Sequence, residues 1–385
     1  MNKYNKRSVF IAACMGMLLF GICFITLGSV AAPLKEKFAL DGVAAGTLFS
    51  ILPLGILTGS FLFGPVCDRY GYQLLLALAC IGLFAGFEGI ALSPSLFLLK
   101  ICVYVVGVCG GIINGATNAL VADISTTNKS ANLSILGVFF GLGALGMPLL
   151  LGLLTHYMAP LHILALVGGF TLIVAITFYF IRFPAPKQPE AGLLANWSSL
   201  LNNVLFIAAF FLFFQSSLEA IINNWTTTYL TEQSGVPEKE ALFALSVHIA
   251  GMVLMRMLSG SVLRNVARTK MLWTCLLLLA AGIVLMQAGT NAFWVTAGLF
   301  LSGAGLAEGF PVMLGFVGER FSKLSGTAFS LVFSIALVGN MLINYLMGIV
   351  VKKYGVAHLT TVAYIEIACM AILFILLIKQ SNHKK

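Results

Sequence analysis

The chain has 385 residues, of which 60% are hydrophobic and only 9% are charged. A soluble globular protein carries about 25% charged residues, so this composition excludes a soluble domain and indicates a polytopic membrane protein. The net charge of +9 comes from Lys and Arg residues scattered along the chain, which excludes the basic stripe that is typical of a nucleic-acid-binding surface.

Twelve apolar stretches, separated by short loops, are each long enough to cross a bilayer as a helix of about twenty residues. The first stretch follows Lys3, Lys6 and Arg7 and is longer than the core of a signal peptide, so we expect an uncleaved first span. The expected fold class is therefore an all-α membrane protein. The predicted spans are 8–30, 43–66, 72–93, 97–121, 132–154, 161–182, 203–230, 241–263, 271–289, 292–317, 325–349 and 358–379.

The Lys and Arg residues predict the orientation of these spans. If the N-terminus is cytoplasmic, most of them fall on cytoplasmic loops. Such an excess is typical of the cytoplasmic face of bacterial membrane proteins. We therefore expect a multi-pass protein of the bacterial inner membrane with both termini in the cytoplasm.

The stretch 183–202 is the longest polar break and is rich in Pro, Asn and Ser, which is typical of a linker. It divides the chain into two predicted halves of six spans each, 1–182 and 203–385. The second half repeats features of the first at a shift of roughly 196 residues. Two similar membrane units in one chain are typical of secondary transporters, whose halves rock about a site between them. The paired positions are Gly64 with Gly260, Asp68 with Arg264, Asp123 with Glu319, Gly143 with Gly339 and Gly152 with Gly348.

The segment 64–71, GPVCDRYG, places an acid, an arginine and two glycines between the second and third spans. It resembles the G-x-x-x-D-R-x-G motif that the major facilitator superfamily carries in this loop, although Tyr72 and Gln73 replace the basic residues that follow it there. The resemblance covers nearly the whole chain and implies twelve helices in two pseudo-symmetric six-helix halves. The resemblance also implies that contacts of this loop stabilise either the inward-facing or the outward-facing state. The gating residues implied are Gly64, Asp68, Arg69 and Gly71.

A finer resemblance lies in the seventh and tenth spans. Glu219 is followed by Trp225, and the tenth span contains the segment 303–311, GAGLAEGFP. These segments are similar to the fucose/galactose/glucose:proton symporter branch of the superfamily, which implies transport of a sugar with a proton. Members of that branch often carry acids in spans one and four, whereas span one here has none and span four has Asn114 and Asn118 instead.

An ionisable group inside a span costs about 3 kcal/mol or more, so each one requires an explanation. Glu219 lies past the middle of the seventh span, and i, i+4 spacing puts Gln215 and Asn223 on the same helix face. A polar stripe facing lipid would be very unfavourable, so we expect these three side chains to line a cavity and bind the solute. Glu219 is also a candidate for the coupling proton; a structural acid satisfied by neighbouring helices is the alternative. The other ionisable residues inside spans are Glu88, His248, Arg256, Glu308 and Glu366.

Arg256 and Glu308 are expected to form a buried ion pair. Each lies about fifteen residues from the outer end of its span, which places both about 22 Å deep at a rise of 1.5 Å per residue. Protonation of Glu308 would open the pair and link proton binding to a conformational change; a static bridge is the alternative. His248 lies two turns further out, where a lone histidine is more often a packing residue.

Two amide ladders occur in the fourth and eleventh spans, where Asn114 with Asn118 and Asn340 with Asn344 have i, i+4 spacing. An amide presents a donor and an acceptor together, which suits a neutral polyol better than an ion. All of these except Asn344 are candidate substrate ligands; hydrogen bonding between helices is the alternative. Trp225 can stack on a sugar ring, or it can anchor the helix at the membrane interface.

The sequence therefore predicts a secondary transporter that moves a small neutral polar solute, such as a sugar, with a proton by alternating access. An efflux antiporter for amphipathic compounds is the alternative within transport, and its signature is an acid in span one or four. A membrane enzyme is not expected, because the five histidines form no catalytic constellation; a sensor that binds solute without moving it stays open. We expect no cofactor, no metal site and no nucleic-acid partner, and a monomer in the lipid bilayer.

Overall fold

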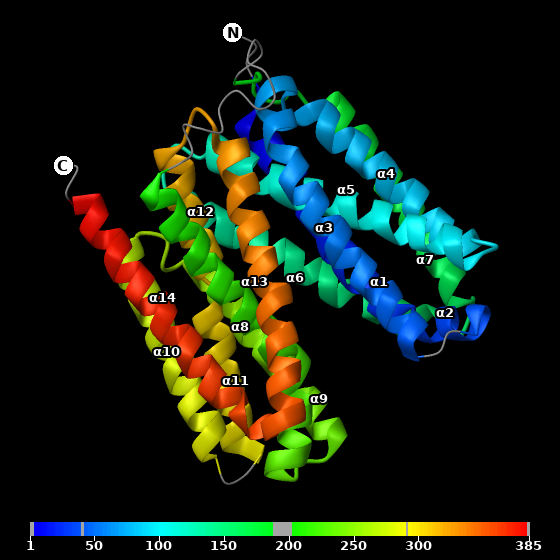
Figure 1. The fold of residues 1–385 in the computed structure, drawn as a ribbon. Helices are drawn as coiled ribbons and strands as arrows, with labels where there is room; N and C mark the ends of the chain where they lie inside the picture. Colours follow the sequence, from blue (N-terminus) through cyan, green and yellow to red (C-terminus); the bar gives the residue numbers. More distant parts are fainter. Residues whose placement is uncertain (1–3, 40–41, 188–201, 290–291, 383–385) are drawn as a thin grey trace. The chain divides into compact units, whose positions relative to one another are not determined.

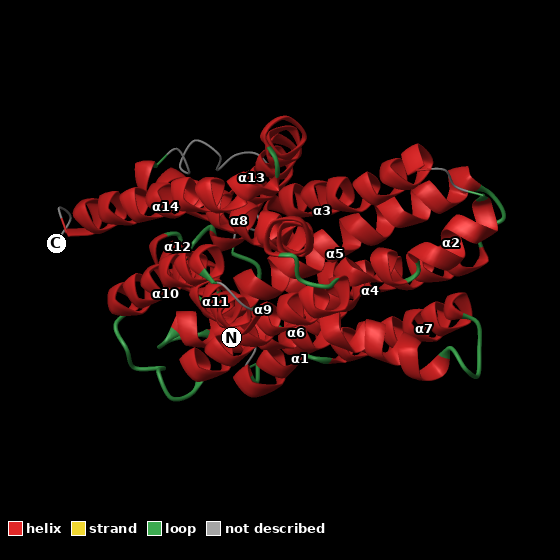
Figure 2. Cartoon of the chain, turned by 90° about the horizontal axis from the view of Figure 1, so that it is seen from below, coloured by secondary structure: helices red, strands yellow, loops and turns green. Residues whose placement is uncertain are grey.

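In the computed structural model the described residues are 4–39, 42–187, 202–289 and 292–382, and they form helices and loops without a strand (Figures 1 and 2). Twelve segments of this part of the chain are long and apolar enough to cross a membrane, which confirms the predicted all-α fold of twelve spans. The helices are α1 (Lys6–Ser29), α2 (Ala31–Phe38), α3 (Gly42–Tyr70), α4 (Tyr72–Leu92), α5 (Leu96–Ile124), α6 (Lys129–Leu154), α7 (Pro160–Phe180), α8 (Asn203–Ser234), α9 (Glu238–Gly260), α10 (Arg268–Ala288), α11 (Ala292–Leu306), α12 (Gly309–Arg320), α13 (Ser325–Tyr354), the short 3₁₀ helix η2 (Val356–His358) and α14 (Leu359–Asn382).

Two features of the helices depart from the predicted spans. The short helix α2 follows α1 directly, and Lys37 near its end donates from Nζ to the carbonyl of Ala91 at 3.2 Å. The predicted tenth span, 292–317, is confirmed as one membrane-crossing segment, Phe293–Arg320, but this segment contains a break between the end of α11 at Leu306 and the start of α12 at Gly309. The first departure adds a helix outside the spans, and the second places a break inside one.

The chain forms two compact units, which are described separately. The start of α6 belongs to unit 2 and the start of α13 belongs to unit 1. The division into two six-helix halves stays a prediction, and residues 188–201 of its predicted linker lie outside the described residues. Unit 1 comprises Met1–Thr126, Leu136–Ser198 and Arg320–Leu331, and unit 2 comprises Thr127–Ile135, Ser199–Glu319 and Val332–Lys385.

The internal repeat is visible in equivalent contacts of the two units. In unit 1, a Cβ atom at Gly64 on α3 would lie 2.7 Å from the Cα of Thr327, in the first turn of α13. In unit 2, a Cβ atom at Gly260 on α9 would lie 3.3 Å from the carbonyl oxygen of Ala131, in the first turn of α6. Ala131 and Thr327 are related by the same shift as the two glycines. The same close approach, made at repeat-related positions, supports two copies of one membrane unit.

Candidate functional site

The tenth span is interrupted at Ala307 and Glu308, between α11 and α12. Pro311 explains the break, because proline has no N–H and leaves the carbonyl of Ala307, four residues earlier, without its helical donor. An unpaired backbone group is costly in hydrocarbon, so neighbouring helices must supply a partner. Interrupted helices of this kind form the substrate and ion sites of many transporters.

Side chains from α8 and α9 supply these partners. Gln215 Nε2 donates to the carbonyl of Leu306 at 2.9 Å, and Arg256 Nε donates to the carbonyl of Ala307 at 3.3 Å. The amide of Gln215 lies directly against Gly309, where a Cβ atom would collide with it. Both side chains are buried. The break is therefore a built feature of unit 2, stabilised from two neighbouring helices.

Glu308 lies in this break with only 1% of its surface exposed. Ser134 Oγ donates to Glu308 Oε2 at 2.8 Å, whereas Oε1 is buried without a hydrogen-bond partner among the described residues. The guanidinium of Arg256 is close enough to interact with this carboxylate through charge. The structure therefore brings Arg256 and Glu308 to one place, while a direct ion pair between them stays a prediction.

Glu219 lies on α8, one turn after Gln215 and one turn before Asn223. It is half-buried, and its carboxylate makes no hydrogen bond to another residue that the structure describes. Arg256 interacts with this carboxylate through charge as well. Asn223 Oδ1 and Gln215 Oε1 are buried without partners within the described ranges. This face of α8 thus has unused hydrogen-bond acceptors.

Two other predicted ligands hold α8 and α13 together within unit 2. Trp225 Nε1 donates to Asn344 Oδ1 at 3.0 Å, which fixes the orientation of the indole ring. Asn340 Nδ2 donates to the carbonyl of Ser216 at 3.2 Å. Both contacts are of the helix-linking kind, so any binding role for Trp225 and Asn340 stays a prediction.

Asn114 and Asn118 bond to each other within α5. Asn118 Nδ2 donates to the Asn114 carbonyl at 2.8 Å and to Asn114 Oδ1 at 3.1 Å. Both residues are buried. The amide ladder inferred from the sequence therefore exists as a bonded pair, and solute binding by it stays a prediction.

Two buried ionisable residues of unit 2 make hydrogen-bonding contacts with neighbouring helices. His248 is fully buried on α9, and its Nδ1 lies 3.0 Å from Ser302 Oγ and 3.1 Å from the carbonyl of Leu299 on α11. Glu366 on α14 is 2% exposed and accepts a hydrogen bond from Ser217 Oγ on α8. In the described part of the chain, no group of three or more His, Cys, Asp or Glu residues is placed to hold a metal ion.

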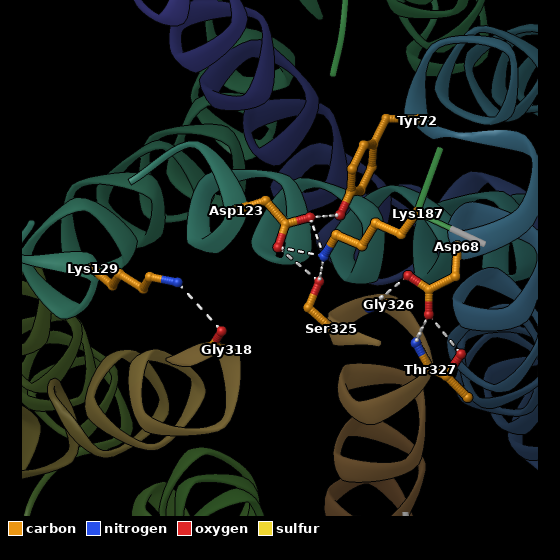
Figure 3. A network of polar contacts seen from close by, with 9 residues as sticks. All are labelled: Asp68, Tyr72, Asp123, Lys129, Lys187, Gly318, Ser325, Gly326 and Thr327. Carbon is orange, nitrogen blue, oxygen red and sulfur yellow. Dashed lines mark hydrogen bonds and ion pairs between the residues drawn. The ribbon is translucent and has the colours of Figure 1, made fainter. Parts of the chain in front are cut away.

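Asp68, near the end of α3, caps the first turn of α13 (Figure 3). Asp68 is 4% exposed, and its carboxylate accepts hydrogen bonds from Gly326 N at 3.2 Å, Thr327 N at 2.8 Å and Thr327 Oγ1 at 2.7 Å. The first N–H groups of a helix have no acceptor within the helix and carry the positive end of its dipole. The buried carboxylate of Asp68 accepts hydrogen bonds from these N–H groups and places a negative charge at the positive end of the dipole.

A second polar network lies beside this cap (Figure 3). Lys187 Nζ lies 2.6 Å from Asp123 Oδ2, and Ser325 Oγ donates to Asp123 Oδ1 at 2.8 Å. The hydroxyl of Tyr72 also donates to Asp123, and the backbone N–H of Lys187 donates to the carbonyl of Asp68 at 3.0 Å. Sequence reasoning missed Lys187, because a lysine in a polar stretch carries no signal of its partner. The sequence analysis names Asp123 only as the repeat partner of Glu319, and that pairing is the one signal that could have directed attention to this network.

The other predicted gating residues shape the turn between α3 and α4. Gly71 has a φ of +83°, a left-handed conformation that strains residues with a side chain. Arg69 is half-buried, and its guanidinium lies 5.2 Å from the ring centroid of Tyr70. Gly64 allows the close approach of α3 to α13 described above. A gating role for these residues stays a prediction.

Membrane spans with an internal repeat and a buried carboxylate in an interrupted helix are typical of membrane transporters. A family model described as Major Facilitator Superfamily matches residues 9–286 and 221–385. The chain therefore belongs to this family of transporters.

Curated relatives are similar over most of the chain. The inner membrane transport protein YdiN of Escherichia coli K12 is 25% identical over 355 residues, which cover 86% of this chain and 80% of YdiN. The 3-(3-hydroxy-phenyl)propionate transporter of the same strain is 28% identical over 315 residues, or 74% and 76% of the two chains. The glucose/mannose transporter GlcP of Bacillus subtilis 168 is 23% identical over 344 residues, or 85% and 84%.

Solved structures of sugar symporters share the fold. The proton:xylose symporter XylE, bound to 6-bromo-6-deoxy-D-glucose, superposes with a TM-score of 0.81 at 14% identity, over 97% of this chain and 95% of XylE. The transporter FucP in its outward conformation gives 0.79 at 17% identity, over 96% of this chain and 97% of FucP. The resemblance to the superfamily that the sequence predicts is confirmed.

Proposed function

We propose that the protein is a secondary active transporter that carries a small neutral polar solute, such as a sugar, with a proton across the bacterial inner membrane. The observation that supports this best is Glu219, a carboxylate inside a span that makes no hydrogen bond to another described residue. An acid is retained in such a place when a ligand or a proton uses it. Structural similarity to sugar:proton symporters and a relative named as a glucose/mannose transporter support the same kind of cargo.

The polar atoms on α8 suit a polyol. A sugar hydroxyl donates one hydrogen bond and accepts others, so it can bind a carboxylate, an amide oxygen or an amide N–H. Gln215 Oε1 and Asn223 Oδ1 are buried acceptors without partners in the described ranges. Together with Glu219 they form a face that favours a donating ligand. We assign the further substrate contacts to Asn114, Asn118, Trp225 and Asn340.

We assign proton coupling to Glu219, Arg256 and Glu308. Arg256 interacts through charge with both carboxylates. When both carboxylates are ionised the three groups carry one net negative charge, and binding of one proton neutralises the set. Because uncompensated charge is costly inside a protein, proton binding changes which arrangement of these helices is most stable.

An anionic cargo is the second candidate, because one relative is named as a transporter of a hydroxyphenylpropionate. Arg256 would be the cation that binds such a carboxylate. However, Arg256 already donates to a backbone carbonyl and interacts with two carboxylates. A further anion would leave the set with excess negative charge, so we favour a neutral solute.

We assign gating to Gly64, Asp68, Arg69 and Gly71. The cap that Asp68 provides fixes the first turn of α13 against α3. Loss of these hydrogen bonds would release that helix end, which is the kind of switch that alternating access requires. A monomer with both termini in the cytoplasm completes the proposal, because each chain carries its own set of twelve spans.

The test uses purified protein in liposomes that contain a pH-sensitive dye. Neutral monosaccharides, disaccharides and aromatic carboxylates are added outside, one at a time. We expect one neutral sugar to acidify the interior. Glu219→Gln should abolish the signal, whereas Glu232→Gln, which changes an exposed carboxylate on the same helix, should preserve it. Acidification by an aromatic carboxylate alone would favour the second candidate, and full activity of Glu219→Gln would refute the assignment of this residue.

A further inference from the structure

Unit 2 contains a cavity of about 250 Å³ that the proposed function leaves unexplained. It lies among the first turn of α6, the end of α9, the start of α10 and the start of α12, and every residue on its wall belongs to unit 2. Its wall includes Ser130, Ser259, Arg264, Asn265, Glu308 and Val312.

The cavity runs from the loop between α9 and α10 to the break in the tenth span. Arg264 and Asn265, in the loop, are exposed. Ser259, Val312 and Glu308, at the inner end, are buried, with 3%, 4% and 1% of their surface exposed. A buried carboxylate is thus connected to an exposed loop through unit 2 alone.

Two residues on the wall have buried polar atoms without protein partners. Glu308 Oε1 and Ser130 Oγ are both buried without a hydrogen-bond partner among the described residues. The hydroxyl of Ser259 also approaches the Glu308 carboxylate, but it donates to the sulfur of Met271 at 3.8 Å. Buried polar groups are almost always hydrogen-bonded, either to protein or to ordered water. A cavity of this volume, with polar side chains over part of its wall, has room for several water molecules. The wall chemistry therefore indicates a hydrated cavity.

Charged and titratable groups approach Glu308 from several neighbouring helices. Arg256 comes from α9, and the buried thiol of Cys275 comes from α10. The start of α6 contributes the hydroxyl of Ser134, which donates to the carboxylate. Further along the wall are Arg264 and Arg268, the second of which pairs with Glu319.

These surroundings suit a proton and oppose a metal cation. A Na⁺ ion at an interrupted helix needs unused backbone carbonyls. The carbonyls of Leu306 and Ala307 instead accept hydrogen bonds from Gln215 and Arg256. A proton needs one oxygen lone pair, which Oε1 of Glu308 provides.

We propose that this cavity is a hydrated path through which Glu308 exchanges its proton with the side of the membrane that bears the α9–α10 loop. The inference deepens the proposed function and rests on it for the role of the proton in transport. The step is an acid–base exchange, in which a proton leaves a hydronium ion in the cavity and bonds to Oε1 of Glu308, or returns. The proton thus reaches the break without passing the solute-binding side chains of α8.

Filling the cavity tests the path. Val312→Phe places a ring in the cavity from α12, and Val312→Thr keeps the side-chain shape and is the matched control. Ala131→Leu fills the cavity from α6 and replaces Val312→Phe if that variant does not fold. In proteoliposomes, we expect Val312→Phe to lose solute-driven acidification by about tenfold or more while solute exchange at equal concentrations stays within about twofold.

A solute-free measurement separates this inference from the proposed function. Infrared spectroscopy follows hydrogen–deuterium exchange of the Glu308 carboxyl group, identified as the band that Glu308→Gln lacks. We expect Val312→Phe to slow this exchange by an order of magnitude. Hydroxyl-radical footprinting of the wild type reports hydration, because Met271 lines the cavity and Met286, on the same helix, does not. Met271 should be oxidised several times faster.

Slower carboxyl exchange in Val312→Phe, with faster oxidation of Met271 than of Met286, supports the path. Unchanged carboxyl exchange in a folded cavity-filling variant overturns it, and so does equal oxidation of the two methionines. If no solute acidifies wild-type liposomes while the infrared result holds, the proposed function fails and the path stands.

Discussion

Removal of the charge of Asp68 is expected to release the first turn of α13. Asp68→Asn keeps the size of the side chain but replaces one carboxylate oxygen with an amide that donates. The carboxylate accepts three hydrogen bonds, two from backbone N–H groups and one from a hydroxyl. At least one of these bonds must be lost, because the new N–H group would face another donor.

The magnitude follows from the geometry of the cap. A hydrogen bond to a charged group contributes about 1.5–3 kcal/mol, and a charge at a helix N-terminus adds about 0.3–1 kcal/mol. The carboxylate is almost fully buried, so solvent does not replace the lost contacts. We therefore expect Asp68→Asn to lower the free energy of opening this helix end by about 2–4 kcal/mol.

Amide hydrogen exchange measured by mass spectrometry checks this expectation. A loss of 1.4 kcal/mol is a factor of ten in an equilibrium constant, so exchange at Gly326 and Thr327 should accelerate by about 30-fold to several hundred-fold. The peptide at the far end of α13 should be unchanged. Glu36→Gln, which alters an exposed carboxylate on α2, is the control.

Exchange at Gly326 and Thr327 that rises less than about threefold in Asp68→Asn would refute the reasoning, since the cap would then contribute little to local stability. Faster exchange along the whole of α13 would also contradict it. That outcome would mean that the substitution loosens the entire helix.

Three further substitutions test contacts that lie within one unit or the other. Gln215→Leu leaves the carbonyl of Leu306 without its donor, so the melting temperature should fall by the equivalent of about 1–3 kcal/mol. An unchanged melting temperature would contradict the importance of this hydrogen bond. Lys187→Met should cost about 1–3 kcal/mol, because it leaves the largely buried carboxylate of Asp123 without its counter-charge. Thermal melting should show a much smaller cost in an Asp123→Asn background, and an equal cost there contradicts the ion pair. Arg256→Ala should reduce the folded yield in size-exclusion chromatography and also reduce transport, because two carboxylates lose their counter-charge. Normal transport by this variant would show that the proposed site is wrong.

The spans could be predicted from the sequence because the bilayer acts on each helix separately. A segment such as 72–93 must be apolar over about twenty residues whatever its neighbours are, and the structure has α4 at Tyr72–Leu92. The polar face of α8 is equally local, since residues four apart on a helix share a face. The grouping of Gln215, Glu219 and Asn223 therefore needed no tertiary information.

The break in the tenth span could be predicted only in part from the sequence. Gly309 and Pro311 are both visible in the sequence, but membrane helices tolerate such residues, so neither by itself predicts a break inside the span 292–317. The break is stable because two donors from other helices, Gln215 and Arg256, satisfy the carbonyls that it leaves open. Their reach to these carbonyls depends on how α8, α9 and α11 pack.

The sequence by itself determined the twelve spans, the internal repeat and the residue types available for chemistry, because hydropathy and helical periodicity are properties of each segment alone. Only the tertiary structure decided which polar atoms meet. Ser134 reaches Glu308 across 174 residues of chain, and Lys187 joins Asp123 across 64. In hydrocarbon every buried polar group requires a partner, but many partners would satisfy that requirement equally, and packing selects among them.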